Sequence, residues 1–266
     1  MLTKIIVLNY IKTKWYIKYM SRKISSETVK RLLKDVRTII RNPLTDQGIY
    51  YIHDELDMLK GYAMIVGPEG TPYFGGYYFF SFKFPIDYPF SPPKVKYMTN
   101  NGETRFNPNL YIDGKVCVSI LNTWQGDKWS SCQTISSILL TLCSLLNENP
   151  LLNEPGINED NIYTIPYCKS IEYKNIDYAI CNMINLNMEC IPGSEFMQFY
   201  SVMKELYYKN YDKLLNIVES NKDKEPETIY VNQYNMITYA NHGMLYNKFI
   251  HTKNIVDQEE NKNNIK

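Results

Sequence analysis

The chain has 266 residues, of which 29 are Lys or Arg, 28 are Asp or Glu, and 44% are hydrophobic. This is a globular composition, long enough for one large domain or for a domain of roughly 150 residues with an appendage. The net charge of +1 argues against nucleic acid as a partner. No apolar run approaches the roughly 20 residues that cross a bilayer, which argues against a membrane protein.

The six cysteines favour free thiols over a metal cluster or a disulfide framework. No two of them form a Cys-x-x-Cys pair, and the chain has only three histidines, so we expect no metal site. We also expect no secretory leader. The expected location is therefore a reducing compartment, the cytoplasm or the nucleus (of the host cell if the chain is viral), where any one cysteine can act as a nucleophile.

The first predicted element is an amphipathic helix with Ser26 as its N-cap and Asn42-Pro43 as its end. Its apolar residues recur at helical spacing, and its basic residues fall largely on the other faces. The apolar residues are Val29, Leu32, Leu33, Val36 and Ile39, and the basic ones are Lys30, Arg31, Lys34 and Arg37.

Turn residues then mark a β region followed by a helix. Of the 12 glycines and 13 prolines, 15 fall within residues 61–126 and none within residues 127–149. Residues 62–66, 77–84 and 94–98 read as strands, and their short connections favour an antiparallel meander. Apolar residues at helical spacing over 135–146 predict a buried helix that stops at Asn149-Pro150.

The rest of the chain shows helical periodicity over 176–184 and 196–218, a charged loop over 221–226, and a polar end expected to be disordered. The fold class is therefore α+β. The predicted organisation is an N-terminal extension (1–23), a core domain (24–190), a helical C-terminal extension (191–250) and a polar tail (251–266).

The segment most suited to chemistry is residues 105–121, between the predicted meander and the buried helix. Asn109 precedes Cys117 by eight positions. A carboxamide can donate to an oxygen that becomes negative when a thioester is attacked, and a cysteine can carry an acyl group as that thioester. The residues alone leave two alternatives open. Cys117, between two valines, could be an inert core residue, and Asn107-Pro108-Asn109 could be a simple turn.

Four motifs in order and in register resemble the ubiquitin-conjugating enzyme family, from about residue 26 to 155 and more loosely to 184. Its large branch with a C-terminal extension, the Z-type, is the most similar. The motifs are Gly67-Pro68-x-x-Thr71-Pro72-Tyr73-x-Gly75-Gly76, Phe84-Pro85-x-x-Tyr88-Pro89-x-x-Pro92-Pro93, Asn107-Pro108-Asn109 with Gly114-Lys115-Val116-Cys117, and Trp129-Ser130.

The resemblance implies a four-stranded antiparallel meander flanked by helices. It also implies that Cys117 accepts ubiquitin or a ubiquitin-like modifier from an activating enzyme, for transfer to a lysine of a protein substrate or to a ligase. No cofactor is implied, since ATP is used by the upstream enzyme. Asn109 falls at the asparagine of the family's His-Pro-Asn motif, and Asn107 replaces the histidine that supports the active-site loop.

Two further site residues follow from the resemblance. Counting back from Pro155 puts Glu154 where relatives carry a residue that orients or deprotonates the incoming lysine, with Asn153 as the competing choice. Tyr111 is a candidate for lining the catalytic groove. A solvated carboxylate and a packed aromatic are the alternatives for Glu154 and Tyr111.

The resemblance also indicates a partner surface. Phe90 falls in the loop that the family presents to ligases, and an exposed Phe is a suitable anchor; a buried Phe90 is the alternative. Ser131 and Cys132 replace the usual Pro-Ala after Trp129-Ser130, which indicates a different ligase set or little dependence on one. The basic face of the first helix is expected to meet the activating enzyme, unless it is merely solvated.

Two other functions remain open. A catalytically silent ubiquitin-binding module of the same fold is argued against by the presence of Cys117 and Asn109. A cysteine hydrolase needs a histidine beside the thiol, and none of His53, His242 and His251 lies near Cys117 in sequence.

Overall fold

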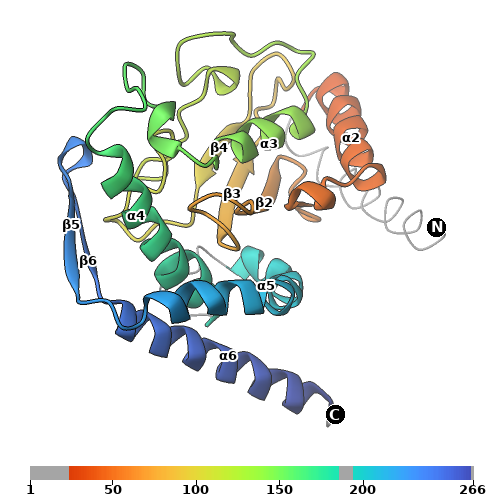
Figure 1. Cartoon of the computed structure of the whole chain (residues 1–266). Helices are drawn as coiled ribbons and strands as arrows, with labels where there is room; N and C mark the ends of the chain where they lie inside the picture. Colours follow the sequence, from red (N-terminus) through yellow and green to blue (C-terminus); the bar gives the residue numbers. More distant parts are fainter. Residues whose placement is uncertain (1–23, 186–193, 265–266) are drawn as a thin grey trace. The chain divides into compact units, whose positions relative to one another are not determined.

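The structure is a computed structural model that describes residues 24–185 and 194–264 (Figure 1). The chain divides into two units that alternate along the sequence. Unit 1 consists of Met1–Ile65, Phe79–Tyr97 and Lys115–Ser144, and unit 2 of Val66–Tyr78, Met98–Gly114 and Leu145–Lys266. The segment with Asn109 therefore belongs to unit 2, and the segment with Cys117 belongs to unit 1.

Four strands form an antiparallel meander in the order β1-β2-β3-β4, as the resemblance implied. They are β1 Ile49–His53, β2 Lys60–Val66, β3 Tyr77–Lys83 and β4 Lys94–Tyr97. The sequence pattern alone identified the last three. β1 has the β-branched and aromatic residues of a strand, but it is only five residues long and three of them are half-buried, which gives no clear alternation.

Two helices of unit 1 pack on each other, α2 (Ser26–Arg41) and α3 (Ile135–Ser144). The N-cap of α2 is Ser25 and not Ser26, because the Ser25 hydroxyl accepts the backbone N–H of Thr28 at 3.0 Å. Asn42 is the C-cap, as predicted. Short 3₁₀ helices cover Thr45–Gln47 (η1) and Ser119–Leu121 (η2).

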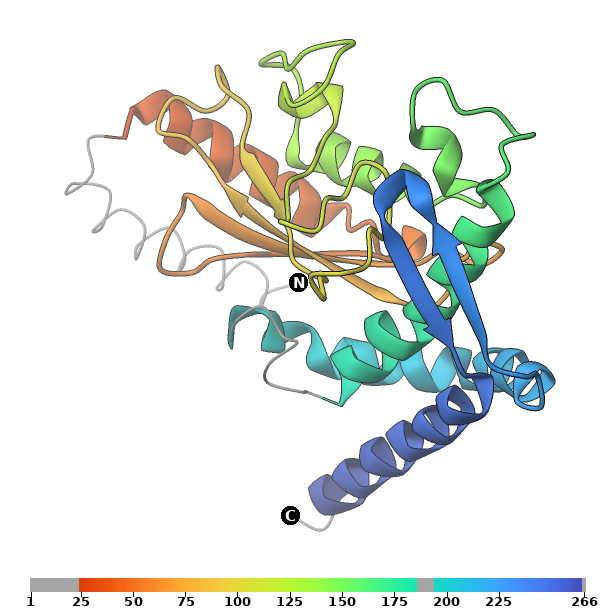
Figure 2. The ribbon, with the colours of Figure 1, turned by 90° about the vertical axis from the view of Figure 1, so that its left-hand side faces the viewer.

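Unit 2 holds the remaining elements. In chain order they are η3 (Pro150–Asn153), α4 (Thr164–Lys174), a π-helical segment η4 (Asn175–Asn182), η5 (Ser194–Phe199), α5 (Tyr200–Asn221), β5 (Glu227–Val231), η6 (Asn232–Tyr234), β6 (Met236–Ala240) and α6 (His242–Asn264). The hairpin of β5 and β6 lies along α4, and α6 packs on α5 and η4 (Figure 2).

Two expectations for the C-terminal region were wrong. The extension is not purely helical, because β5 and β6 pair as a hairpin with alternating burial. The polar tail is not disordered, because α6 continues to Asn264. Phe249 and Val256 bury one face of α6, and its polar end is held by an ion pair of Glu260 with Lys204 at 2.5 Å and by a hydrogen bond from Tyr200 to Glu259 at 2.6 Å. The predicted extension 1–23 and the boundary at 190–191 lie outside the described residues.

The glycines of the first motif are required by a close approach of two backbone segments in unit 2. The N–H of Gly67 donates to the carbonyl of Gly76 at 2.8 Å, and a Cβ on Gly67 would lie 1.7 Å from the carbonyl oxygen of Tyr73. Gly75 has a positive φ of 75°. Any side chain at Gly67 would therefore force the turn apart. In the described part of the chain, none of the helices has the length and apolar composition needed to cross a bilayer.

Candidate active site

Cys117 lies in unit 1, in a segment we call the thiol loop (residues 115–123). Its thiol is reduced and donates to the carbonyl oxygen of Thr123 across 3.0 Å. The residue is only 2% exposed. A nucleophile must meet its substrate, so the contact with Thr123 has to open before this sulfur can react.

The thiol loop is closed by bonds between residues close in sequence. The Thr123 hydroxyl accepts the N–H of Val118 at 2.9 Å and donates to the Val118 carbonyl at 3.0 Å. Asn122 adopts the left-handed conformation, with φ 59°, and its side chain accepts the backbone N–H of Trp129 at 2.9 Å. Asn tolerates this conformation better than most residues. The side chains of Thr123 and Asn122 thus hold the turn whose Thr123 carbonyl accepts the thiol.

A hollow of about 740 Å³ adjoins this loop within unit 1. Four residues of the thiol loop line it, together with residues around the proline-rich segment 85–93 and β4. The loop residues are Lys115, Val116, Leu121 and Thr123. An extended peptide could approach the neighbours of Cys117 along this surface, although the sulfur is covered.

Asn107 lies in unit 2, in a segment we call the carboxamide loop (residues 105–111), and it is fully buried. Its amide donates to the Tyr73 hydroxyl at 3.0 Å and to the Leu145 carbonyl at 2.8 Å, and its carbonyl oxygen accepts the N–H of Asn109 at 2.9 Å. The Tyr73 hydroxyl in turn donates to the Phe106 carbonyl at 2.6 Å. Asn107 therefore supports the loop with backbone bonds, as proposed from the sequence.

Arg105 and Tyr111 stack at the other end of the carboxamide loop. The guanidinium carbon of Arg105 lies 3.5 Å from the ring centroid of Tyr111, and an Arg105 nitrogen donates to the Pro108 carbonyl at 2.5 Å. Tyr167, from α4, donates to the Arg105 carbonyl at 2.7 Å. The half-buried Tyr111 is therefore a packed aromatic that also shapes the loop surface.

Glu154 is half-buried after η3, and it accepts a hydrogen bond of 2.7 Å from the hydroxyl of Tyr234. Burial and this bond to a carboxylate raise the pKa of Tyr234 far above its usual value, so the phenol stays a donor. The competing Asn153 is occupied within its own loop. Its amide donates to the Leu145 carbonyl and its oxygen accepts from Asn147, each at 3.0 Å.

The predicted partner surface lies in unit 1. Phe90 is 63% exposed, so the buried alternative was wrong for this residue. Ser131 and Cys132 are also exposed. Arg31 is not a solvated basic residue, because it pairs with the buried Asp35 at 3.0 Å and donates to the carbonyls of Ser131 and Gln133. The basic surface of α2 is therefore narrower than its sequence suggested.

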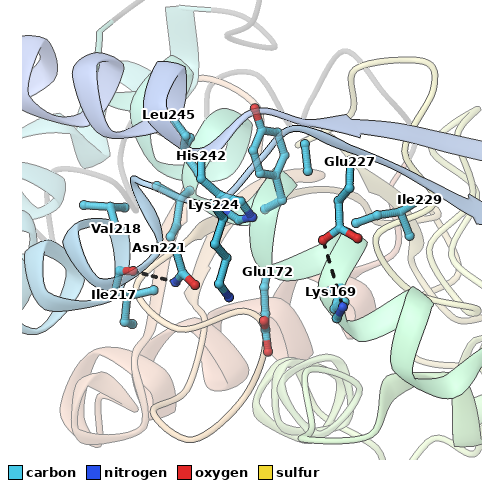
Figure 3. A pocket seen from close by; sticks show the side chains of 13 residues that line it. Lys169, Glu172, Ile217, Val218, Asn221, Lys224, Glu227, Ile229, His242 and Leu245 are labelled. Carbon is cyan, nitrogen blue, oxygen red and sulfur yellow. Dashed lines mark hydrogen bonds and ion pairs between the residues drawn. The ribbon is translucent and has the colours of Figure 1, made fainter.

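The three histidines lie in different surroundings. His53 bonds the Tyr51 hydroxyl at 2.7 Å and the Met58 carbonyl at 2.9 Å within the sheet region. His242 lines a small hollow of about 140 Å³ in unit 2, with Lys169, Glu172, Lys224 and Glu227 near it (Figure 3). None of the described residues lining that hollow is a cysteine, and His251 is exposed on α6.

Unit 2 brings four of the sequence-predicted residues into two groups of contacts. Asn107 bonds Asn109, and Tyr111 connects to Glu154 through Arg105 and Tyr234. Sequence reasoning missed Thr123, Arg105 and Tyr234. The contact of Thr123 with Cys117 is local, and a Thr hydroxyl commonly bonds nearby backbone groups, so the sequence contained a signal for Thr123. Tyr234 lies 80 residues from Glu154, and no sequence pattern points to Tyr234. The pairing of Cys117 with Asn109 stays a prediction.

Comparison with known proteins agrees with the resemblance. The family model described as ubiquitin-conjugating enzyme matches residues 29–176. The chain is 39% identical over 189 residues to ubiquitin-conjugating enzyme E2 Z of Xenopus tropicalis, covering 68% of this chain and 60% of that protein. It is 40% identical over 179 residues to the Homo sapiens protein of the same name, covering 64% of this chain and 50% of that protein.

A third relative is the dual E2 ubiquitin-conjugating enzyme/E3 ubiquitin-protein ligase BIRC6 of Mus musculus, which is 34% identical over 217 residues. That match covers 75% of this chain and 4% of the mouse protein. The chain thus spans about half to three fifths of the length of the E2 Z proteins it matches. The matched segments contain the motifs and Cys117, and the chain belongs to the ubiquitin-conjugating enzyme family, in a branch similar to E2 Z.

Proposed function

We propose that this chain accepts ubiquitin or a ubiquitin-like modifier as a thioester on Cys117 from an activating enzyme. It then transfers the modifier to a substrate lysine, directly or through a ligase. The observation that supports the proposal is the reduced thiol of Cys117 inside the segment matched by the family model. The motifs of the sequence resemblance put this cysteine at the family's acceptor position.

The chemistry follows from the residue types. The Cys117 sulfur attacks the modifier's activated C-terminal carbonyl, displacing the activating enzyme's thiol. A lysine amine then attacks the new thioester, and the carbonyl oxygen becomes negative until the C–S bond breaks. In this proposal Asn109 donates to that oxygen, a contribution of roughly 10²–10³ in rate for one donor in a well-studied protease. Glu154 takes the proton that the amine must lose.

The contacts within unit 2 favour Glu154 over Asn153 as the proton acceptor. Both polar groups of the Asn153 side chain serve its own loop, and an amide is a very weak base. Glu154 has a carboxylate with lone pairs to spare after the bond from Tyr234. An anion also attracts a cationic lysine before it deprotonates it.

The partners proposed are an activating enzyme and, where one takes part, a ligase. The exposed cations of α2, Lys30 and Lys34, support contact with the activating enzyme. The exposed Phe90 supports contact with a ligase. ATP acts only in the upstream activation, so the proposed reaction on this chain needs no cofactor, and the proposed location is the cytoplasm or nucleus.

The deciding experiment incubates the full chain with activating enzyme, ATP and ubiquitin and looks for an adduct that a thiol reductant removes. Cys117→Ser should give a reductant-resistant ester or nothing, while Cys132→Ser, which removes an exposed thiol, should load normally. An adduct unchanged in Cys117→Ser would refute the proposal. Because the modifier is unidentified, the assay is repeated with a panel of activating enzymes and modifiers.

Asn109 is tested in the same assay. Asn109→Ala should leave loading nearly intact and slow discharge to free lysine, because in this proposal Asn109 donates to the oxyanion that the attack of the lysine amine creates. Equal loss in both steps would show that Asn109 acts only through the structure of the loop.

A second candidate function is a silent module that binds ubiquitin without transfer. The specific observation in its favour is the 2% exposure of Cys117. This candidate predicts binding of ubiquitin with no adduct under any activating enzyme of the panel. One reductant-sensitive adduct on Cys117 is enough to exclude it.

A further inference from the structure

Arg105 is held between two tyrosine rings that come from segments far apart in sequence. Its guanidinium carbon lies 3.5 Å from the centroid of Tyr111 in the carboxamide loop and 4.8 Å from the centroid of Tyr234. A cation over aromatic faces is attracted by their electron density, and the attraction grows when water is excluded. The carboxamide loop is therefore attached to the segment that carries Tyr234.

Tyr234 is the last residue of η6, in the turn of the β5–β6 hairpin. The turn follows the last strand pair, Val231 with Met236, and is closed by Asn235 with φ 50°. This hairpin was not expected from the sequence. It packs on α4, where the ring of Tyr234 lies 5.7 Å from that of the buried Tyr167. The position of Tyr234 is thus fixed by the C-terminal extension.

The hydroxyl of Tyr234 donates to Glu154 at 2.7 Å. Tyr234 therefore contacts both of the groups that the proposed reaction uses in unit 2, Glu154 directly and the loop of Asn109 through Arg105. The charged and titratable groups that act on Tyr234 are Glu154, Arg105 and Tyr111. A donor bond to one carboxylate oxygen restrains the side chain while leaving the other oxygen available.

We propose that Tyr234 is a positioning residue for transfer, by which the C-terminal extension orients Glu154 toward the incoming amine. The inference rests on the proposed function and deepens it. As the amine nitrogen bonds to the thioester carbon, its proton passes to the Glu154 carboxylate, the C–S bond breaks, and Cys117 leaves as a thiolate that regains a proton from solvent. Tyr234 keeps its own proton throughout.

The test is Tyr234→Phe in the full chain, with Tyr230→Phe as the matched control, since Tyr230 lies on the same hairpin and is 58% exposed. Phenylalanine keeps the ring beside Arg105 and removes only the hydroxyl. We expect normal loading of Cys117 and a discharge to free lysine slowed by about 3- to 10-fold, a part of the 10²–10⁴ that a positioned acid–base group supplies. The control should match the wild-type chain in both steps.

Two readouts separate positioning from a merely structural role. Hydroxylamine is already neutral near neutral pH and needs no base to remove a proton before it attacks, so its discharge should be slowed much less than lysine discharge in Tyr234→Phe. In a Glu154→Gln background, Tyr234→Phe should cause no further loss, because Tyr234 acts through the carboxylate.

The outcomes are distinct. Lysine discharge at the wild-type rate in Tyr234→Phe, or an equal loss with hydroxylamine, or an additive loss in the double variant, overturns the role of Tyr234 while the thioester function stands. A failure of the wild-type chain to load on Cys117 refutes the proposed function itself, and with it this inference. A loss confined to lysine discharge that is absent in the Glu154→Gln background supports it.

Discussion

The thiol loop and the carboxamide loop are held in opposite ways. Around the sulfur, the thiol loop is held by bonds between residues close in sequence, since Cys117 bonds the carbonyl of Thr123, six residues away, and Val118 bonds the Thr123 hydroxyl, five residues away. The carboxamide loop is held by groups from distant parts of unit 2, including Tyr73 and Leu145 on Asn107. Local contacts cover the sulfur in the first loop, whereas a network of buried bonds fixes the second.

This difference fits the two tasks in the proposed reaction. A nucleophile has to be uncovered when the modifier arrives, and local bonds to an exposed turn break more easily than a buried network. A donor to a developing charge has to stay in place, because preorganised groups need no rearrangement when the charge appears. The comparison therefore predicts that changes in the carboxamide loop cost stability and that changes in the thiol loop alter access to the sulfur.

The largest effect on stability is expected for Asn107→Ala. The change removes three hydrogen bonds and leaves the Leu145 carbonyl and the Asn109 N–H without this partner in a buried site. We expect a loss of about 2–4 kcal/mol in the free energy of unfolding, measured by urea denaturation. Asn109→Ala keeps the backbone bond and is the control. Equal stability in the two variants would show that the network is not what holds the loop.

A fall in pH provides the second test, because it acts on a histidine of unit 1, whereas the hydrogen-bond partners of Asn107 take up no proton. Burial lowers the pKa of His53 from 6.5 to about 4, so this imidazole is neutral in the folded chain while the unfolded chain takes up a proton. The free energy of unfolding is therefore unaffected by His53 above pH 6.5, and it decreases as the pH falls from 6.5 toward 4. The loss amounts to about 2–3 kcal/mol. Urea denaturation followed from pH 6.5 to pH 4 should show a much smaller loss in His53→Gln.

The two loops also differ in how far the sequence predicted them. The motifs around Cys117 and Asn107-Pro108-Asn109 identified both segments, and the capacity of Asn107 to bond backbone groups was foreseen from its chemistry. Turn and strand signals gave the meander apart from β1, whose five residues show no clear alternation. These features depend on residues close together in the chain.

The contacts that complete the carboxamide loop were not predictable in this way. Arg105 meets Tyr234, and Glu154 meets the same residue, only because β5 and β6 form a hairpin that packs on α4. The strands β5 and β6 are short and follow segments with helical periodicity, so the whole extension was predicted to be helical. The end of α6 was missed for a related reason, since its polar residues are held by an ion pair and a hydrogen bond with α5 that composition does not reveal.

A third prediction concerns the cover over Cys117. Thr123→Val keeps the shape of the side chain and removes both hydroxyl bonds to Val118, so the turn opens more often. We expect alkylation of Cys117 by iodoacetamide to become several-fold faster, with a stability loss of only about 1 kcal/mol.

The exposed Cys132 gives an internal reference, because it should react before Cys117 in the wild-type chain and at an unchanged rate in the variant. Thr123→Ser retains the hydroxyl and should behave as the wild type. Mass spectrometry of peptides at successive times measures the alkylation rates of Cys117 and Cys132 in the wild-type chain and in both variants. Equal alkylation of Cys117 with valine or threonine at 123 would mean that something other than this turn controls access to the sulfur.

The smallest effect on stability is expected for Phe90→Ala, and here the comparison is between recognition and support. Phe90 is exposed, while the neighbouring Pro89 carbonyl accepts the indole N–H of the buried Trp129 at 2.7 Å, and Trp129 is bonded to Asn122 of the thiol loop. Truncating Phe90 leaves those bonds intact, so the free energy of unfolding should change by less than about 0.5 kcal/mol. Loading of Cys117 should also be unchanged.

If this surface binds a ligase, ligase-dependent transfer should fall by about tenfold or more, the loss expected for an aromatic anchor. A fall in loading in the absence of a ligase would instead show that Phe90 supports the thiol loop. The surface that recognises partners and the turn that covers the sulfur would then not be separate.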